Sequence, residues 1–435
     1  MTTEHEKYIR RNIHTYPFKY AYNNYDDFFK KEQGSIYIHI PFCSSKCHFC
    51  DYTVYVNTDE DLREQYVAAL CEEIRRFPDN PVFPRFAIEA IYFGGGTPGM
   101  LTAEQLTRIL AACRDTFDVS PGAEIAVEFD PKSVEQAKID TLHDAGFTRL
   151  SIGIQSFNED ILRDCNRPHT LADIARAIDV VRKSRFTHVN IDLIYPLLGL
   201  TSEIWEDSLR KAIDLNVACI TVYPLEVWEK TAYHNWIMKK GKQLPKIHEE
   251  KQMALSAFTL LEEAGYKTGS TSGYYRPDLC DNYCVFLDYY WRTWPMIGFG
   301  VSSKSVIHQY LYTNIKSVRD YIARIRDRKP VMDFSTLMTK DQEMRRVMIR
   351  GLKVGNVLKD DFLTRFGVPM TLVFGDILQK LKNDNYLLEN DEEIRLTQQG
   401  QLYSNAVWEQ FYTDDDLLPP QNNEVQFGIS ELILD

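Results

Sequence analysis

The sequence predicts an α/β protein with a parallel β-sheet at its core and helices outside it. Apolar runs of strand length, rich in β-forming residues, recur along the chain, and each is followed by a stretch of helical character. Six such β-α units in series imply parallel strands. Either a doubly wound sheet or a full or partial barrel fits this pattern. In both, chemistry belongs at the carboxyl ends of the strands.

The expected elements can be placed on the chain. The strands are Ser35–Pro41, Ala90–Gly95, Glu124–Asp130, Arg149–Ser156, His188–Tyr195 and Cys219–Glu226. The helices between them include Thr102–Phe117, Val134–Ala145, Leu171–Ser184 and Ser202–Leu215. Two boundaries have a local signal. Thr102, with Gln105 three residues on, is typical of a capping box, and Gly146 stands where a left-handed helix end is expected.

Beyond the sixth strand the pattern changes. A long helix at His248–Ala264 precedes an aromatic run, Tyr283–Pro295, and the Gly/Ser-rich segment Met296–Ile307 is expected to return to the sheet. From about Asp333, short helices and a polar hairpin indicate a small helical domain with a two-stranded wing. We therefore expect an N-terminal extension (1–34), a main domain (35–310) and a C-terminal helical and winged domain (311–435).

The composition narrows the classes of function. The chain has 435 residues, and its formal net charge of -12 makes it a poor binder of phosphate backbones, so we expect no nucleic-acid partner. No apolar stretch is long enough to span a membrane, and the N-terminus lacks a signal-peptide core, so we expect a cytoplasmic protein. Nine cysteines in such a chain indicate reduced thiols, some of them available to bind metal.

The strongest motif is HIPFCSSKCHFC, in which Cys43, Cys47 and Cys50 have the spacing C-x3-C-x2-C. Three thiolates from one tight loop can bind three irons of a cubane [4Fe-4S] cluster and leave the fourth iron without a protein ligand. That open iron can chelate the amino and carboxylate groups of S-adenosylmethionine (SAM) and pass an electron into its sulfonium. A zinc site is the alternative, with His39 or His48 as the fourth ligand.

Several motifs follow the cysteines in order: YFGGGTPGML, EIAVEFDP, LSIGIQSF, NRPH and NIDLIY. Together they resemble the radical SAM enzymes around oxygen-independent coproporphyrinogen III oxidase, the HemN-like branch. The likeness spans Ser35 to Ile307 and continues more weakly through RLTQQGQLYSNAVWEQFY. It implies a partial (β/α)6 TIM-like barrel with a small C-terminal domain, a [4Fe-4S] cluster, SAM, and an electron donor such as flavodoxin or ferredoxin.

The resemblance also implies a set of SAM contacts. The family places a residue beside the cluster-bound SAM where this chain has Tyr37, and the glycines of the GGGTP turn let the backbone approach the SAM amino group because they lack a Cβ. Arg167 suits a carboxylate, because its guanidinium can bind one in bidentate fashion. The residues carried over are Tyr37, Gly94, Gly95, Gly96, Thr97, Glu128, Gln155, Arg167 and Asp192.

The same branch often binds a second SAM, which implies a site around Ile194, Leu225 and Lys304. Here the chain departs from the oxidase. The oxidase has a fourth cysteine just beyond the triad, whereas this chain has Asp51 and Tyr52 after Cys50, and Lys304 stands where an aliphatic residue is expected.

These departures favour methyl or methylene transfer to an unsaturated carbon, as in the class C methyltransferases and cyclopropanases of this branch. That reaction implies two SAM molecules and a planar or apolar unsaturated substrate. A coproporphyrinogen-type oxidase or a haem-degrading relative is one alternative. A non-enzymatic haem-trafficking protein is another, although haem-handling relatives carry His-Asn-x-x-Tyr-Trp where this chain has FLDYYW (Phe286–Trp291) and no histidine.

Two further features stay open. Cys280 and Cys284 form a close pair in CDNYC. The leading interpretation is two ordinary reduced thiols; the alternatives are a redox-active pair, a cysteine that acts in the chemistry, and an auxiliary cluster, which would need more thiolates. The aromatic run Tyr283–Pro295 either lines a pocket for a planar substrate or packs between the barrel and the C-terminal domain.

Overall fold

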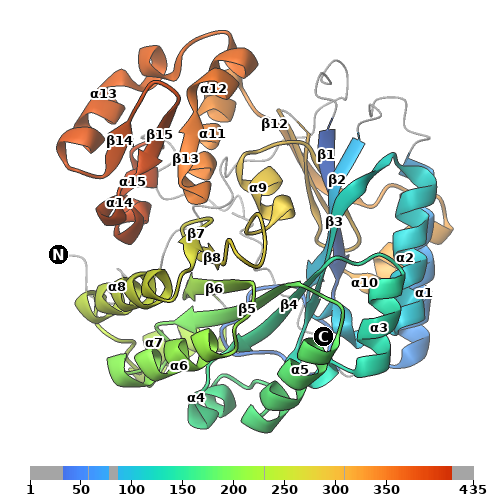
Figure 1. Cartoon of the computed structure of the whole chain (residues 1–435). Helices are drawn as coiled ribbons and strands as arrows, with labels where there is room; N and C mark the ends of the chain where they lie inside the picture. The colour runs from blue at the N-terminus through green and yellow to red at the C-terminus, as the bar shows by residue number, and fades with distance from the viewer. Residues whose placement is uncertain (1–32, 57, 78–86, 230, 308, 414–435) are drawn as a thin grey trace.

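The computed structural model describes residues 33–56, 58–77, 87–229, 231–307 and 309–413. The extension expected at residues 1–34 lies almost wholly outside these ranges. Figure 1 shows a main body built on one curved sheet, with a smaller lobe of C-terminal helices beside it. None of the described helices is long and apolar enough to cross a membrane.

A twelve-stranded sheet forms the centre of the main body. Its first six strands lie side by side in chain order and are parallel, as six β-α units in series predict. All six expected strands are confirmed: they are β1 (Gln33–Ile40), β2 (Ala87–Gly95), β3 (Val119–Phe129), β4 (Arg149–Gln155), β5 (His188–Tyr195) and β6 (Cys219–Pro224).

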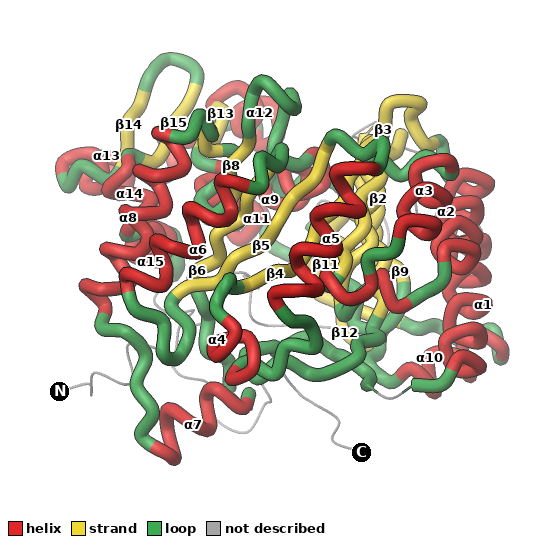
Figure 2. Tube along the Cα trace, turned by 60° about the horizontal axis from the view of Figure 1, so that its bottom comes forward, coloured by secondary structure: helices red, strands yellow, loops and turns green. Residues whose placement is uncertain are grey.

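Helices cover the outer side of these strands (Figures 1 and 2). The capping box of Thr102 and Gln105 is present at the start of α2, and Gly146, just after α3, has the left-handed φ of 92° that its position needs. The apolar faces of strands and helices share one buried core. The helices are α1 (Glu60–Arg76), α2 (Ala103–Thr116), α3 (Gln136–Asp144), α4 (Glu159–Asp164), α5 (Leu171–Lys183), α6 (Ser202–Asp214), α7 (Ala232–Lys240) and α8 (Ile247–Glu263).

The sheet continues beyond the six units at both edges. The segment expected to return does so: β9 (Met296–Phe299) pairs parallel with β1, and Gly298 lies opposite Tyr37. The remaining strands are antiparallel: β10 (Lys304–Ile307), β11 (Tyr310–Asn314) and β12 (Met332–Leu337) on one side, β8 (Gly273–Tyr275) and β7 (Lys267–Thr268) on the other. Edge strands β12 and β7 do not pair in the described chain, so the barrel is open. Helices α9 (Val285–Trp291) and α10 (Val318–Arg326) complete the main body.

The C-terminal lobe has its own apolar core, which begins at Met344. Its wing has three strands rather than the expected two, because the left-handed Gly355 ends α11 and lets β13 pair with β15. The sheet of the main body runs to Leu337, past the boundary expected at residue 310, so the domain boundary stays a prediction. The elements of the lobe are α11 (Lys340–Val354), β13 (Asn356–Leu358), α12 (Lys359–Phe366), α13 (Met370–Asn383), β14 (Leu387–Glu389), β15 (Glu393–Leu396), α14 (Gln398–Leu402) and α15 (Ser404–Glu409).

Candidate active site

The three motif cysteines stand on the loop that leaves the carboxyl end of β1. Backbone hydrogen bonds join this loop to the turn after β2 and to the segment at Tyr55, where the loop folds back on itself. Gly96 N donates to Ile40 O (2.8 Å), Thr97 N donates to Phe42 O (2.8 Å), and Cys43 N donates to Tyr55 O (3.0 Å). The loop is therefore a hydrogen-bonded structure, and it presents the cysteines at the edge where parallel strands end.

The glycines of the GGGTP turn are required by this packing. A Cβ on Gly96 would lie 2.8 Å from the carbonyl oxygen of Phe42 and 3.0 Å from Cys43 Sγ. Gly95 has a left-handed φ of 113°, and a Cβ there would meet the ring of His39 at 2.7 Å. Only glycine lets the turn after β2 come this close to the cysteine loop.

The cysteine thiols are half-buried and in a polar setting. Arg167 Nη1 donates to Cys47 Sγ (3.1 Å), and Cys43 Sγ shares a hydrogen bond with Thr97 Oγ1 (3.5 Å). Burial raises the pKa of Cys43 to about 11 and that of Cys50 further. The thiols of Cys43 and Cys50 would therefore ionise when a metal group binds them and not before.

The spacing of the donors favours a cluster over a single ion. In the part of the chain that the structure describes, one set of three His, Cys, Asp or Glu donors lies within 4.8 Å of one another, and it does not include the motif cysteines. A tetrahedral zinc shell needs donors at least that close. His48 Nδ1 instead binds Asp164 O (2.7 Å), and the ring of His39 binds the Tyr37 hydroxyl (3.2 Å). The wider spread of the three thiols suits a cubane cluster.

Two half-buried carboxylates, Glu128 on β3 and Asp192 on β5, line the same cavity. Glu128 accepts a hydrogen bond from the Tyr92 hydroxyl (2.7 Å), and burial raises its pKa to about 7. Asp192 accepts from Asn190 Nδ2 (2.8 Å) and Ser151 Oγ (3.2 Å), and burial raises its pKa as well. A cationic or hydrogen-bond-donating ligand would stabilise the ionised form of both carboxylates.

Gln155 ends β4 in a left-handed conformation, with φ of 71°. Its Oε1 is buried and has no hydrogen-bond partner. A buried acceptor without a donor is destabilising, typically by about 1–3 kcal/mol, so this amide is suited to a ligand.

Arg167 sits between the cysteine loop and a buried acid. Besides Cys47, it donates through Nη2 to Asp130 Oδ2 (2.8 Å) and to Gly153 O (2.6 Å). The ring of His169 binds the same Asp130 oxygen (2.8 Å). Although burial opposes it, the hydrogen bonds from His169 and Arg167 hold the pKa of Asp130 below its ordinary value. The sequence interpretation placed Asp130 at a strand end but gave it no role. The structure shows it anchoring Arg167.

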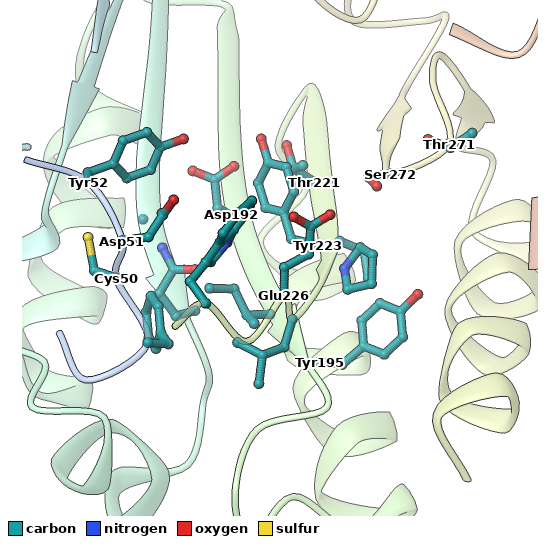
Figure 3. Close-up of a pocket in the computed structure, with 18 of the residues that line it drawn as sticks. Cys50, Asp51, Tyr52, Asp192, Tyr195, Thr221, Tyr223, Glu226, Thr271 and Ser272 are labelled. Atoms are coloured by element: carbon teal, nitrogen blue, oxygen red, sulfur yellow. The ribbon is translucent and has the colours of Figure 1, made fainter. Parts of the chain in front are cut away.

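These residues line one cavity of about 1150 Å³. Every expected contact residue lines it except Gly94, which lies beneath Tyr37 and Tyr92. Figure 3 shows Asp192, Thr221 and Tyr223 turned into the cavity from β5 and β6, with Cys50, Asp51 and Tyr52 on the facing side. Ile194, Leu225 and Lys304 also border it.

A stack of aromatic rings forms one wall. The ring of Phe286 lies 4.8 Å from that of Tyr92 and 6.0 Å from that of Tyr37, and Tyr290 is stacked on Phe286 at 6.2 Å. Other members of the aromatic run pack elsewhere, such as Trp294 against Tyr289 at 4.5 Å. The guanidinium of Arg350, on α11 of the C-terminal lobe, lies 4.8 Å from the centre of the Trp291 ring, so the run both borders the cavity and packs against that lobe.

A cationic group lies behind this wall. Lys304 and Lys353 line the cavity, and the buried Arg350 guanidinium stacks 4.0 Å from the centre of the Tyr290 ring. Burial and the nearby Arg350 and Arg346 lower the pKa of Lys304 well below its ordinary value. The sequence interpretation missed the contribution of α11. Its signal was the spacing i, i+4, i+7 of Arg346, Arg350 and Lys353, which puts three cations on one helix face.

The second cysteine pair is divided by the structure. Cys284 Sγ donates to the buried carboxylate of Glu124 (3.3 Å), whereas Cys280 lies 3.8 Å from Cys219, measured between the sulfurs. The alternative of a redox-active Cys280–Cys284 pair is therefore not supported, because Cys280 lies against the strand residue Cys219 instead.

Two family models match the chain. The model of the radical SAM superfamily matches residues 37–212, and the model of the HemN C-terminal domain matches residues 338–403. The heme chaperone HemW of Lactococcus lactis is 27% identical over 386 residues, which are 88% of this chain and 99% of that protein. The oxygen-independent coproporphyrinogen III oxidase of Salmonella typhimurium is 29% identical over 383 residues, 85% of this chain and 83% of the enzyme.

A solved structure agrees with these matches. Coproporphyrinogen III oxidase (HemN) from Escherichia coli, a radical SAM enzyme, superimposes with a TM-score of 0.75 at 25% identity, over 88% of this chain and 90% of that chain. The expected TIM-like barrel with a C-terminal domain is thereby confirmed. These relatives fit the two alternatives expected for the reaction, an oxidase or a haem-trafficking protein, better than methyl or methylene transfer.

Proposed function

Because the chain belongs to the HemN-like branch of the radical SAM superfamily, we propose that it abstracts a hydrogen atom from a tetrapyrrole that bears carboxylate side chains, in an oxidation of the coproporphyrinogen type. One observation carries this proposal. A single cavity is bordered by three thiols, by the polar residues expected to bind SAM, and by Lys304 and Lys353. A radical generated at one end would thus meet an anionic ligand held at the other.

Members of this superfamily use a [4Fe-4S] cluster and SAM. We assign the cluster to Cys43, Cys47 and Cys50, whose spread suits a cubane and whose loop is fixed by hydrogen bonds. When bound, the cluster and SAM supply an electron and a 5′-deoxyadenosyl radical, which takes a hydrogen atom from the substrate. The electron would come from a small donor such as a flavodoxin or ferredoxin, in the cytoplasm.

The SAM contacts follow from the chemistry of the lining. Glu128 would accept a hydrogen bond from the SAM amino group beside the GGGTP turn, and its ionisation would be favoured by that cation. Asp192 would accept from a ribose hydroxyl, and Gln155 Oε1 would gain the donor that it lacks. Arg167 would face the SAM carboxylate while Asp130 fixes its position. Tyr37 would border the same ligand.

The rest of the cavity would hold the substrate. Ligand pockets are ordinarily ~300–1000 Å³, so about 1150 Å³ leaves room for a large molecule beside SAM. The stacked rings of Phe286 and Tyr290 suit contact with the individual pyrrole rings of such a tetrapyrrole. Lys304 and Lys353 would bind its carboxylates, and a carboxylate beside Lys304 would raise the pKa of that amine again.

The proposal uses one SAM. A second SAM, as methyl transfer would need, would bring its sulfonium cation into the region of Ile194, Leu225 and the amine of Lys304. Like charges at short range in a buried site repel strongly, and burial together with Arg350 and Arg346 already lowers the pKa of Lys304.

The substrate radical would lose CO2 together with one electron, which needs an acceptor. The test is therefore an anaerobic assay of the reconstituted protein with SAM, a reductant, a one-electron acceptor and coproporphyrinogen III. We expect 5′-deoxyadenosine in amounts that depend on the substrate, together with a decarboxylated product detected by mass spectrometry. Cys47→Ala is the control for the cluster, because it should lose iron and form no deoxyadenosine. S-adenosylhomocysteine with a methylated product would instead establish methyl transfer. Tight retention of haem with no deoxyadenosine would establish a haem chaperone.

A further inference from the structure

A second group of reactive side chains lies at the opposite end of the strands from the candidate active site. Arg149, His188 and Cys219 are the first residues of β4, β5 and β6. Cys280 reaches them from the segment between β8 and α9, and Cys284 follows one turn later. Nothing in the proposed reaction uses this group, which does not line the large cavity.

The two sulfurs of Cys219 and Cys280 lie 3.8 Å apart. Cys219 is fully buried, and its thiol donates to Tyr283 O (3.4 Å). Cys280 is partly exposed and has exposed neighbours on both sides, so a small reagent can reach it. The pair therefore combines one accessible sulfur with one protected sulfur at close range.

The positive charge of Arg149 favours thiolate chemistry over metal binding in this group of residues. Its Nη1 donates to Tyr283 O (2.6 Å) and to Cys219 Sγ (3.5 Å) and also contacts His188 Nε2. Although burial opposes its charge, the surrounding thiols and Glu124 raise its pKa above the ordinary value. A fixed guanidinium among His188, Cys219 and Cys280 repels a divalent cation and stabilises a thiolate.

The two thiols differ in acidity. The hydrogen bond from Cys219 and the charge of Arg149 lower the pKa of Cys280 despite its partial burial. Burial raises the pKa of Cys219 to about 12. Cys280 is therefore the nucleophile of the pair, and Cys219 is the thiol that can resolve a mixed disulfide.

We propose that Cys219 and Cys280 form a reversible disulfide by exchange with a small disulfide oxidant of the glutathione class. The Cys280 thiolate attacks one sulfur of oxidised glutathione, forming a mixed disulfide and releasing one glutathione thiolate. Cys219 then attacks Cys280 Sγ, its proton passing to the second departing glutathione. The dithiol loses two electrons, and one oxidised glutathione becomes two reduced molecules.

The bond would connect two parts that frame the active-site cavity. Tyr283, which lies between Cys280 and α9, already binds Thr221 on β6 through its hydroxyl (2.6 Å). Helix α9 carries Phe286 and Tyr290 of the aromatic wall. The disulfide would tether the segment that leads into α9 to the start of β6. This inference does not depend on the identity of the substrate.

The test equilibrates the anaerobic holoprotein in buffers of reduced and oxidised glutathione, traps free thiols by alkylation, and maps peptides by mass spectrometry. We expect a Cys219–Cys280 linkage whose fraction follows the glutathione ratio and which dithiothreitol reverses. Cys280 and Cys284 fall on the same tryptic peptide, so the Cys284→Ser variant, which should keep the linkage, fixes the assignment.

Two further variants separate the roles of the sulfurs. Cys219→Ser should accumulate a glutathione adduct on Cys280, because the resolving thiol is gone, whereas Cys280→Ser should leave Cys219 unmodified. Cys113→Ser removes a buried thiol of α2 and should leave the fraction of the Cys219–Cys280 linkage unchanged. The inference is overturned if wild-type protein forms only a stable Cys280 adduct, or if it binds one zinc ion that Cys280→Ser loses.

Discussion

Substitution of Gly96 by alanine would test whether close contact between the GGGTP turn and the cysteine loop holds the metal site together. The new Cβ would lie 2.8 Å from Phe42 O, 3.0 Å from Ile40 O and 3.0 Å from Cys43 Sγ. Two of these atoms belong to the backbone and cannot rotate away. The hydrogen bond from Gly96 N to Ile40 O (2.8 Å) would be stretched as the turn moves out.

The size of the effect follows from these contacts. Overpacking of a tight site costs roughly 1–3 kcal/mol, and a lost hydrogen bond adds about 0.5–1.5 kcal/mol. We expect the loop to be destabilised by about 2–4 kcal/mol, which shifts the equilibrium between formed and open loop about 30- to 700-fold. Iron and sulfide per chain after anaerobic reconstitution should fall accordingly, and the melting temperature of the apoprotein should decrease.

The matched control is Gly122→Ala, because no atom lies within 4 Å of a Cβ at that exposed position. It should keep the full iron content and the melting temperature of the wild type. If Gly96→Ala behaves like Gly122→Ala in both measurements, the close approach of the turn to the loop is not what supports the cluster.

Three other predictions concern charge. Burial raises the pKa of Glu128 to about 7, so between pH 4.5 and 7 the folded apoprotein binds more protons at this residue than the unfolded chain does. The free energy of unfolding should therefore fall as pH rises across that window. Glu128→Gln should flatten this pH dependence, measured by denaturant titrations. Lys304→Met should raise KM for a carboxylate substrate about 10- to 150-fold, as expected for a charged hydrogen bond, whereas the cavity-lining control Lys246→Met should not. Arg167→Met should lower the stability to unfolding by about 3–5 kcal/mol by leaving Asp130 underpaired, and adding Asp130→Asn should restore part of it. An unchanged slope, KM or melting curve would refute the respective reasoning.

The sequence predicted the parts of the site that depend on local pattern. Cys43, Glu128 and Asp192 each stand at or near the end of a strand, and parallel strands bring their carboxyl ends to one edge. Once the alternation of strands and helices was recognised, convergence of these residues followed. The two-stranded wing was the exception among local features, because β13 is short and its pairing depends on the turn at Gly355.

Contacts between distant segments could not be predicted in this way. Cys280 is close to Cys284 in sequence, but the return of the chain along the sheet puts it against Cys219, 61 residues away. The same holds for Arg350, whose helix belongs to the C-terminal lobe and whose guanidinium stacks on Tyr290 of the main body. The periodicity of apolar residues shows which face of a helix will be buried, but not which surface that face will contact.

Because α11 contacts α9, the two lobes contribute to different parts of the candidate site. The barrel alone contains every residue assigned to the cluster and to SAM, whereas the wall for the substrate is backed by cations that the smaller lobe supplies. Under the proposed function, exchange of that lobe between relatives would alter which molecule is accepted without disturbing how the radical is made. In this arrangement the proposed radical formation stays with the barrel, and the choice of substrate changes with the C-terminal lobe.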